Sequence, residues 1–152
     1  MSSVFTLNLE DVQLDEKPMA GGSIRYDFPL HSATGMASMA VVLFELEPGN
    51  ELATHTDSAE EILLVLDGEG EAHVNGETVI VRAGDLAVVP SMAPHGVRNI
   101  GDTTLRVIGF FSSSTVVSTF EEGIRPEGER VHVIGSNGTI LAQLSEPAAL
   151  SA

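Results

Sequence analysis

The stretch "EILLVLDGEGEAHVNGETVIV" (residues 61–81) alternates apolar runs with two short turn signals. Asp67-Gly68 and Asn75-Gly76 are dipeptides that tight hairpin turns favour, because such turns need a positive φ at their central residues. The runs beside the turns contain valine and isoleucine, which suit a pleated strand. The stretch therefore predicts two or three strands joined by hairpins.

The first apolar run of this stretch has hydrophobic residues on both of its faces. Side chains alternate along a strand, so Leu63 and Val65 share one face while Ile62, Leu64 and Leu66 share the other. A small isolated barrel normally leaves the outer face of its strands in water. The pattern predicts that this strand is covered on both sides, by a second layer or by another subunit, and we expect a homodimer.

Strand signals continue in both directions from this stretch. They fall in "SMAVVLFELE", "DLAVVP", "HGVRNIGDTTLRVIGFF", "STVVSTF" and "RVHVIGSNGTILAQL", the last with a turn expected at Asn137-Gly138. No amphipathic helix longer than a turn or two is evident. Short strands with turns every eight to twelve residues are typical of an all-β sandwich or barrel. No linker interrupts the middle of the chain, so we expect one domain over residues 1–152.

Composition excludes several classes of function. A net charge of −15 repels phosphate, so we expect no nucleic acid and no anionic membrane as partner. The absence of cysteine excludes disulfides and thiolate metal sites. The N-terminal residues lack a basic region followed by an apolar run, and no apolar stretch approaches a membrane span. We therefore expect a soluble, cytoplasmic protein.

Potential metal ligands gather in "HTDSAEE", from His55 to Glu61. His55 and Asp57 are two residues apart and share one face of a strand, and Glu61 has the same parity, whereas Glu60 has the opposite one. His95 follows in "PSMAPHGVRN", just before another strand. Three or four nitrogen and oxygen ligands converging from two hairpins would suit a divalent transition metal.

With these spacings the sequence resembles the cupin superfamily, which carries two short motifs. The first places glycines, two histidines and a glutamate at positions that correspond to Gly49, His55, Asp57, Glu61 and Gly68. The second places two glycines, a proline, a histidine and an asparagine at positions that correspond to Gly84, Pro90, Met92, His95 and Asn99. The chain departs from the family pattern where Asp57 replaces a histidine and Met92 replaces a glycine.

The resemblance implies a double-stranded β-helix, or jelly roll, with one metal ion inside the barrel. It implies a barrel core at about residues 38–112, flanked by strands at both ends. It also implies His55, Glu61 and His95 as ligands and puts Asp57 in a ligand position. Cupins include dioxygenases, isomerases and cyclases as well as binding domains, so the fold does not settle the reaction.

Asp57 has two possible roles. As a ligand it would complete a set of two imidazoles and two carboxylates, which favours iron, manganese or zinc over copper. Alternatively it accepts a hydrogen bond from a neighbour or turns to solvent. Buried carboxylates and imidazoles are costly without a cation, so we expect a bound divalent ion at His55, Asp57, Glu61 and His95 rather than a site that has lost its metal.

We expect a small-molecule pocket around the metal, with Tyr26, Phe44, Met92 and Phe110 as substrate contacts, although core packing is the alternative for each. Arg25 and Arg106 are further polar candidates, and His73 is expected at the surface. The favoured function is a metal-dependent enzyme of dioxygenase, isomerase or cyclase type acting on a small organic molecule. The alternative is a non-enzymatic cupin that binds or senses a small molecule.

Overall fold

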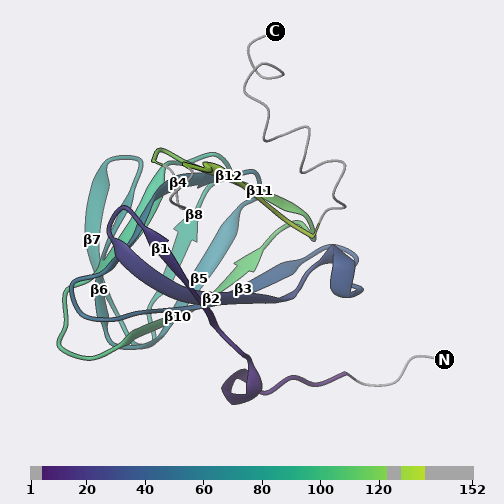
Figure 1. The fold of residues 1–152 in the computed structure, drawn as a ribbon, viewed down its shortest axis with the longest axis horizontal. Helices are drawn as coiled ribbons and strands as arrows, with labels where there is room; N and C mark the ends of the chain where they lie inside the picture. The colour runs from purple at the N-terminus through teal and green to yellow at the C-terminus, as the bar shows by residue number, and fades with distance from the viewer. Residues whose placement is uncertain (1–4, 123–127, 136–152) are drawn as a thin grey trace, which may run out of the picture.

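Two antiparallel sheets of six strands each make up the described part of the chain, residues 5–122 and 128–135 of a computed structural model (Figure 1). Sheet A has the order β1 (Asp15–Met19), β2 (Gly22–Leu30), β3 (Ala40–Leu46), β10 (Leu105–Phe111), β5 (Glu61–Asp67) and β8 (Leu86–Val89). Sheet B has the order β12 (Val131–Ile134), β11 (Val116–Phe120), β4 (Glu51–Asp57), β9 (His95–Asn99), β6 (Glu69–Val74) and β7 (Glu77–Arg82). The all-β jelly roll is confirmed.

Helical structure in the described residues is limited to two single 3-10 turns, η1 (Leu9–Asp11) and η2 (Ser32–Thr34). Within that part of the chain no helix is long and apolar enough to cross a membrane. The turn expected at Asn137-Gly138 lies outside the described residues. Because residues 136–152 lie outside as well, a single domain over the whole chain stays a prediction.

The two turn signals of residues 61–81 have different outcomes. Asn75 and Gly76 take φ values of 52° and 81° and connect β6 to β7 as a tight hairpin, as predicted. The hairpin predicted at Asp67-Gly68 is wrong, because β5 belongs to sheet A and β6 to sheet B. Gly68, with φ 88°, instead turns the chain from one sheet to the other. A Cβ there would lie 2.8 Å from the carbonyl oxygen of Thr104, so the corner needs glycine.

The main core lies between the sheets. Alternate residues of β3, among them Val42, Phe44 and Leu46, face inward and meet residues such as Val97 from sheet B. Strand alternation places the apolar side of each sheet in this space, which is the basis of sandwich packing. The same inward alternation on β4 carries polar residues at its end, so the candidate site lies within the sandwich.

The outer face of sheet A is also apolar, as the pattern of β5 predicts. Leu9, Val12 and Leu14 of the N-terminal segment pack against a second cluster of Val41, Leu43 and Ile108. Part of this face is therefore covered by the chain itself. The rest is open, and its exposed side chains are Ile62 (42%), Leu86 (67%) and Val88 (59%).

Candidate metal centre

Four polar side chains meet inside the sandwich, and they come from both sheets. His55 and Asp57 occupy the last two inward positions of β4, and His95 begins β9 opposite His55. Glu61 begins β5 on the facing sheet. All four are buried, with Asp57 only 2% exposed. The sequence-predicted ligands are thus brought together, and Glu60 is exposed, as its parity predicts.

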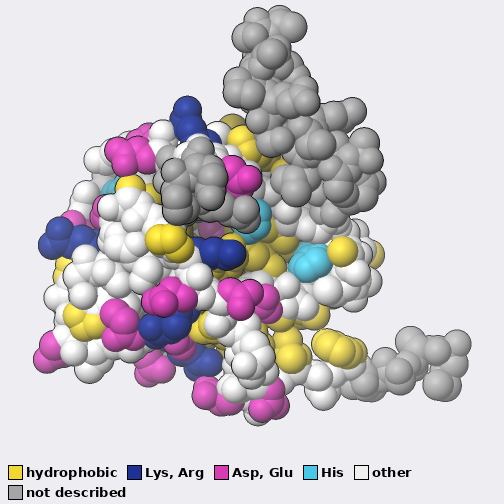
Figure 2. All heavy atoms as spheres, viewed as in Figure 1, with side chains coloured by type: hydrophobic (Ala, Val, Ile, Leu, Met, Phe, Trp, Pro, Cys, Tyr) yellow, Lys and Arg dark blue, Asp and Glu magenta, His cyan; other side chains and the backbone are white. Residues whose placement is uncertain are grey.

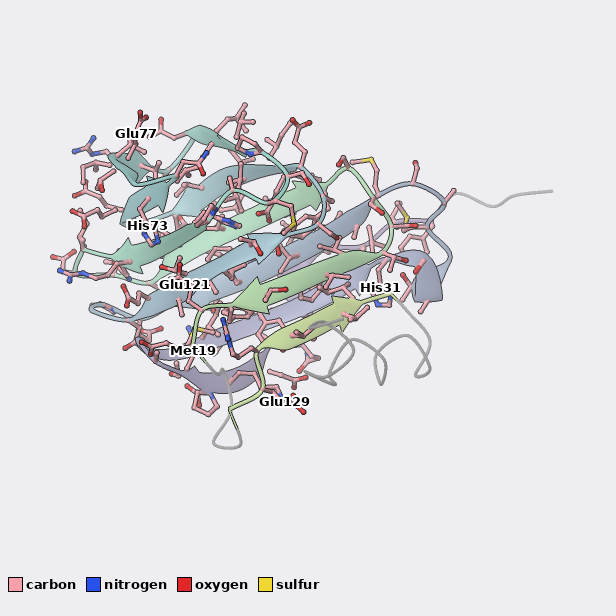
Figure 3. All side chains as sticks on the ribbon, turned by 90° about the horizontal axis from the view of Figure 1, so that it is seen from above. Met19, His31, His73, Glu77, Glu121 and Glu129 are labelled. Atoms are coloured by element: carbon pink, nitrogen blue, oxygen red, sulfur yellow. The ribbon has the colours of Figure 1, made fainter. Side chains whose placement is uncertain are left out.

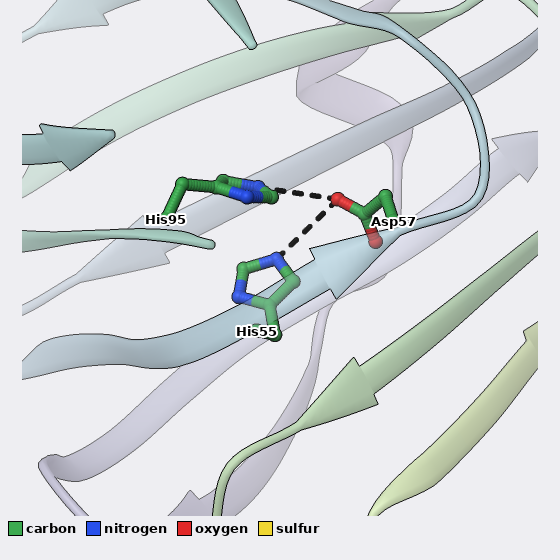
Figure 4. Close-up of side chains that lie close together, drawn as sticks. All are labelled: His55, Asp57 and His95. Carbon is green, nitrogen blue, oxygen red and sulfur yellow. Dashed lines mark ion pairs between the residues drawn. The ribbon is translucent and has the colours of Figure 1, made fainter. Parts of the chain in front are cut away.

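Three of these side chains form a tight group (Figure 4). The Asp57 Oδ2 atom lies 3.1 Å from His95 Nε2 and 3.5 Å from His55 Nε2. One ligand atom from each of the three residues lies within 4.8 Å of the others. Glu61 is adjacent, with Oε2 at 3.7 Å from His95 Nε2. One ion could contact the first three residues, and Glu61 is placed to join them.

Both imidazoles are held by the same hydrogen bond. His55 Nδ1 lies 2.8 Å from the carbonyl oxygen of Ala53, and His95 Nδ1 lies 2.9 Å from that of Ala93. Because a carbonyl only accepts, each Nδ1 carries the proton and donates it. In the neutral imidazole the Nε2 lone pair then points into the site, which is the usual arrangement of a metal-binding histidine.

Two buried atoms of the site have no hydrogen-bond partner, Asp57 Oδ2 and His95 Nε2. They lie close to each other without hydrogen-bond geometry. An unsatisfied buried polar group costs about 1–3 kcal/mol. A divalent cation would satisfy both atoms at once, so these residues fit a metal ion.

Charges in the site are strongly coupled. Burial opposes the charge on His95, but the carboxylates of Asp57 and Glu61 outweigh it and raise the pKa of His95 to about 10. Burial likewise opposes the charge on Asp57, but the two imidazoles and the Ser118 hydroxyl hold its pKa well below the usual range. Burial raises the pKa of Glu61. Without a cation, these shifts favour an ion pair between the Asp57 carboxylate and a protonated His95.

Gly109 makes room for the Glu61 carboxylate. It lies on β10, next to β5 in sheet A, where it pairs with Leu63. A Cβ at this position would collide with Glu61 Oε1 and would lie 2.8 Å from a methyl carbon of Val42. Glycine is therefore required here if Glu61 is to point into the site.

A cavity of about 100 Å³ begins at the four polar residues and extends between the sheets. Its lining is mainly apolar and includes the aromatic residues Tyr26, Phe28, Phe44, Phe111 and Phe120. The Phe120 ring stacks on His55 with centroids 4.7 Å apart. Lys17 is the single lysine or arginine among the described residues of the lining. Hydrophobic and histidine side chains also reach the surface near the middle of the face in Figure 2, between acidic residues.

The sequence-predicted substrate contacts divide into two pairs. Tyr26 and Phe44 line the cavity, whereas Met92 and Phe110 do not. Phe110 packs on the outer face of sheet A, because its neighbours Gly109 and Phe111 take the inward positions of β10.

Met92 is 59% exposed in the turn before β9, with a φ of 65°. The family's glycine at this position is explained by that left-handed backbone. The Met92 amide donates to the Asp57 carbonyl at 2.8 Å, so the turn is tied to the site although its side chain is not.

Other residues also depart from expectation. Arg25 and Arg106 do not line the cavity and instead form ion pairs with Glu45, at 3.0 Å and 3.2 Å. His73, expected at the surface, is half-buried, and its Nε2 lies 2.9 Å from the Thr54 hydroxyl. Figure 3 shows His73 and His31 toward opposite ends of the molecule.

Sequence reasoning missed three lining residues of the β11–β12 region. Ser118 and Phe120 lie on β11, and His132 lies on β12. The period-two alternation of "VVSTF" marks Ser118 and Phe120 as sharing a face, which was the available signal. His132 carries no such signal, because its strand is short and both of its neighbours are valine.

The geometry of the site and the order of the strands agree with a comparison against known families. A family model described as "Cupin domain" matches residues 42–111, which contain all four candidate ligands. Residues 42–111 are a cupin domain.

The proteins that this chain resembles have names that point to different functions. An oxalate-binding protein of Thermotoga maritima is 37% identical over 65 residues, which are 42% of this chain and 54% of that protein, so the match spans about half of that curated relative. The crystal structure of a predicted oxalate decarboxylase from Thermotoga maritima is 24% identical with a TM-score of 0.65, covering 72% of this chain and 99% of the other, a likeness that shows the fold.

A third relative is the salicylate 1,2-dioxygenase of Pseudoaminobacter salicylatoxidans, solved as adducts with gentisate. It is 26% identical with a TM-score of 0.53, over 61% of this chain and 25% of the other. The two solved structures share the fold of this chain, and the names of the three relatives point to different functions.

Proposed function

We propose that this cupin is a metal-dependent enzyme that acts on a small, largely apolar organic molecule, and that its reaction is of dioxygenase type. The observation that carries the proposal is the buried cluster of His55, Asp57 and His95 at the end of an apolar cavity, with two polar atoms left unsatisfied. Two imidazoles and one carboxylate are the ligand set of many non-haem iron oxygenases. We propose Glu61 as the fourth ligand.

The chemistry of the ligands favours a hard divalent ion, and we propose iron or manganese, with zinc as the alternative. Two neutral imidazoles and two carboxylates would leave a divalent site close to neutral overall. When bound, the ion would supply Lewis acidity and a position for oxygen ligands. Copper(I) prefers sulfur ligands, and none of the four candidate ligands contains sulfur.

The other residues of the cavity have roles that need no metal. Aromatic side chains such as Phe44 and Phe120 exclude water and would orient a flat apolar molecule against the ligands. Lys17 supplies one positive charge in the described lining, which suits a neutral or singly charged molecule. A doubly charged molecule such as oxalate would enter a cavity with two carboxylates and little to offset its charge.

The experiment begins with metal analysis of the purified chain, followed by oxygen uptake with hydroxylated aromatic acids, including salicylate and gentisate. We expect one ion of iron or manganese per chain and uptake that depends on it. His55→Ala should lose both metal and activity. His31→Asn is the matched control, because it removes an imidazole far from the site and keeps a side chain that can cap η2. No metal in the wild-type chain, and none on titration, would overturn the proposal.

A second candidate function is non-enzymatic binding of a small molecule. It is favoured by the name of the oxalate-binding relative and by the departures at Asp57 and Met92 from the family motifs. Calorimetric titration with oxalate and with gentisate separates the two candidates. Tight oxalate binding without any turnover would favour this second function.

We also propose that the protein is a homodimer, formed through the open part of the outer face of sheet A. Three exposed apolar side chains on the neighbouring strands β5 and β8 support this, since a contiguous exposed apolar patch is typical of an interaction surface. The cytoplasmic location stays a prediction.

A further inference from the structure

The two oxygens of the Asp57 carboxylate have different surroundings. Oδ1 accepts a hydrogen bond of 2.5 Å from the Ser118 hydroxyl. Oδ2 has no hydrogen-bond partner and faces the Nε2 atoms of His95 and His55. The two oxygens therefore have different roles: Oδ1 is held by the protein, and Oδ2 points at the candidate metal position.

Ser118 is built into the sandwich at this point. It lies on β11 directly opposite Asp57 in the pairing of β11 with β4. Its side chain is 6% exposed, between the inward-facing Val116 and Phe120. A carboxylate has no hydrogen to donate, so the hydroxyl must be the donor. The Ser118 hydroxyl thus has its hydrogen committed to Asp57.

A carboxylate in this position needs such a donor because it cannot be held as the histidines are. His55 and His95 each donate Nδ1–H to the carbonyl oxygen two residues earlier, which fixes the ring. Asp57 has no equivalent group and would be free to rotate or to offer both oxygens. The Ser118 hydroxyl, on the neighbouring strand, fixes the Asp57 carboxylate by donating a hydrogen bond to it.

We propose that Ser118 is a positioning residue that holds Asp57 as a one-oxygen metal ligand through Oδ2. The inference rests on the proposed metal centre. By retaining Oδ1, Ser118 keeps Asp57 from occupying two coordination positions, so that one more position is open to a substrate oxygen. Ser118 and Asp57 together take the place of the second histidine of the family motif.

Removal of the hydroxyl tests this proposal in the full-length chain. In Ser118→Ala we expect the Kd for Mn²⁺ to rise by about 10–100-fold, the usual effect of losing a hydrogen bond to a ligand. The visible spectrum of the Co²⁺-loaded chain should also change, because both oxygens of Asp57 become available. Thr119→Val is the matched control, because it removes a hydroxyl from the next residue of β11, which is not part of the cavity lining.

A second pair of variants guards against poor folding of Ser118→Ala. Ser118→Thr and Ser118→Val have side chains of nearly equal shape and differ in the hydroxyl. We expect the threonine variant to keep the wild-type Mn²⁺ affinity and Co²⁺ spectrum. We expect the valine variant to bind Mn²⁺ more weakly and to have an altered Co²⁺ spectrum. A hydroxyl with only a structural role would change the free energy of unfolding and leave the spectrum as it was.

Equal Mn²⁺ affinity and equal Co²⁺ spectra in the threonine and valine variants would overturn the inference. The titrations need no turnover, so failure of the proposed enzymatic function gives a different result. A wild-type chain that consumes no oxygen with any compound, but whose Mn²⁺ affinity depends on the hydroxyl of residue 118, supports the inference and contradicts the proposed reaction.

Discussion

At the scale of single residues, the site is governed by the carboxylate of Asp57. It is almost fully buried, it faces two imidazoles through one oxygen, and it raises the pKa of His95. A histidine at this position would bring neither the charge nor the need for Ser118. The replacement therefore changes the charge of the site, and with it the ion that we expect the site to prefer.

Metal affinity should depend steeply on pH. Although burial lowers the pKa of His95, Asp57 and Glu61 raise it to about 10, so the imidazole is protonated at neutral pH in the metal-free protein. An imidazole binds a metal ion only in its neutral form, so metal binding releases the proton of His95. The Kd for Mn²⁺ should therefore fall by about tenfold for each unit of rising pH, from about pH 7 to pH 9. Titrations at several pH values measure this slope.

Asp57→Asn is the control for the pH dependence. It removes one of the carboxylates that keep His95 protonated, so the dependence on pH should become shallower while the overall affinity falls. A Kd that does not change with pH in the wild-type chain would contradict the prediction.

Met92 should be a source of instability that the glycine of the family motif avoids. Its φ of 65° is a left-handed conformation that side chains disfavour, and the side chain is 59% exposed. We expect Met92→Gly to raise the free energy of unfolding by about 0.5–1 kcal/mol, measured by urea denaturation. Met92→Ala keeps the Cβ and should show no such gain. An equal gain in both variants would mean that the methionine side chain, and not the backbone, is responsible.

At the scale of the strands, local sequence patterns predict inward and outward faces well and pairing partners poorly. Alternation predicted that His55, Asp57 and Glu61 share an orientation, and all three are buried inside the sandwich, His55 and Asp57 from sheet B and Glu61 from sheet A. The contact between Asp57 and Ser118 joins residues 61 positions apart, and no local pattern predicts which strand lies beside β4.

The errors made from the sequence also arise at the scale of strands. Asp67-Gly68 has the composition of a hairpin turn, but β5 and β6 pair with other strands, and that choice depends on the whole fold. Phe110 was expected to line the pocket, but it packs on the outer face of sheet A. Gly109 takes the inward position beside Phe110. The reason for a glycine there is the Glu61 carboxylate packed against it, which only the structure shows.

The close approach of β10 to Glu61 leads to a prediction for Gly109. In Gly109→Ala the added methyl must displace the carboxylate, since Val42 and Leu63 also lie within about 3 Å and leave no other space. We expect the Mn²⁺ affinity to fall by more than about tenfold and the free energy of unfolding to fall by about 1–3 kcal/mol. Gly101→Ala is the matched control, because the nearest atom to its added Cβ is 3.5 Å away. Unchanged affinity in Gly109→Ala would show that Glu61 is not a ligand.

At the scale of the whole molecule, the sandwich has one apolar interior and a second apolar surface outside sheet A. The interior combines the core with the candidate site, so the candidate ligands lie directly beside residues of the core. The outer surface is covered by the N-terminal segment over β3 and β10 and is open over β5 and β8. β8 is also an edge strand, so its backbone groups on one side are not paired within sheet A.

This open surface predicts self-association that a single charge should prevent. Leu86 is 67% exposed on β8, on the same face as Val88, which pairs with Ile62 of β5. A stable dimer buries about 800 Å² on each partner with an apolar centre, and a carboxylate there would be buried without a partner. We expect light scattering to give a dimer for the wild-type chain and a monomer for Leu86→Glu. Ala20→Glu adds the same charge in the exposed turn between β1 and β2, at the other edge of sheet A, and should stay dimeric. A wild-type chain that is monomeric at every concentration would contradict the prediction, and the apolar surface over β5 and β8 would then be open in the working protein.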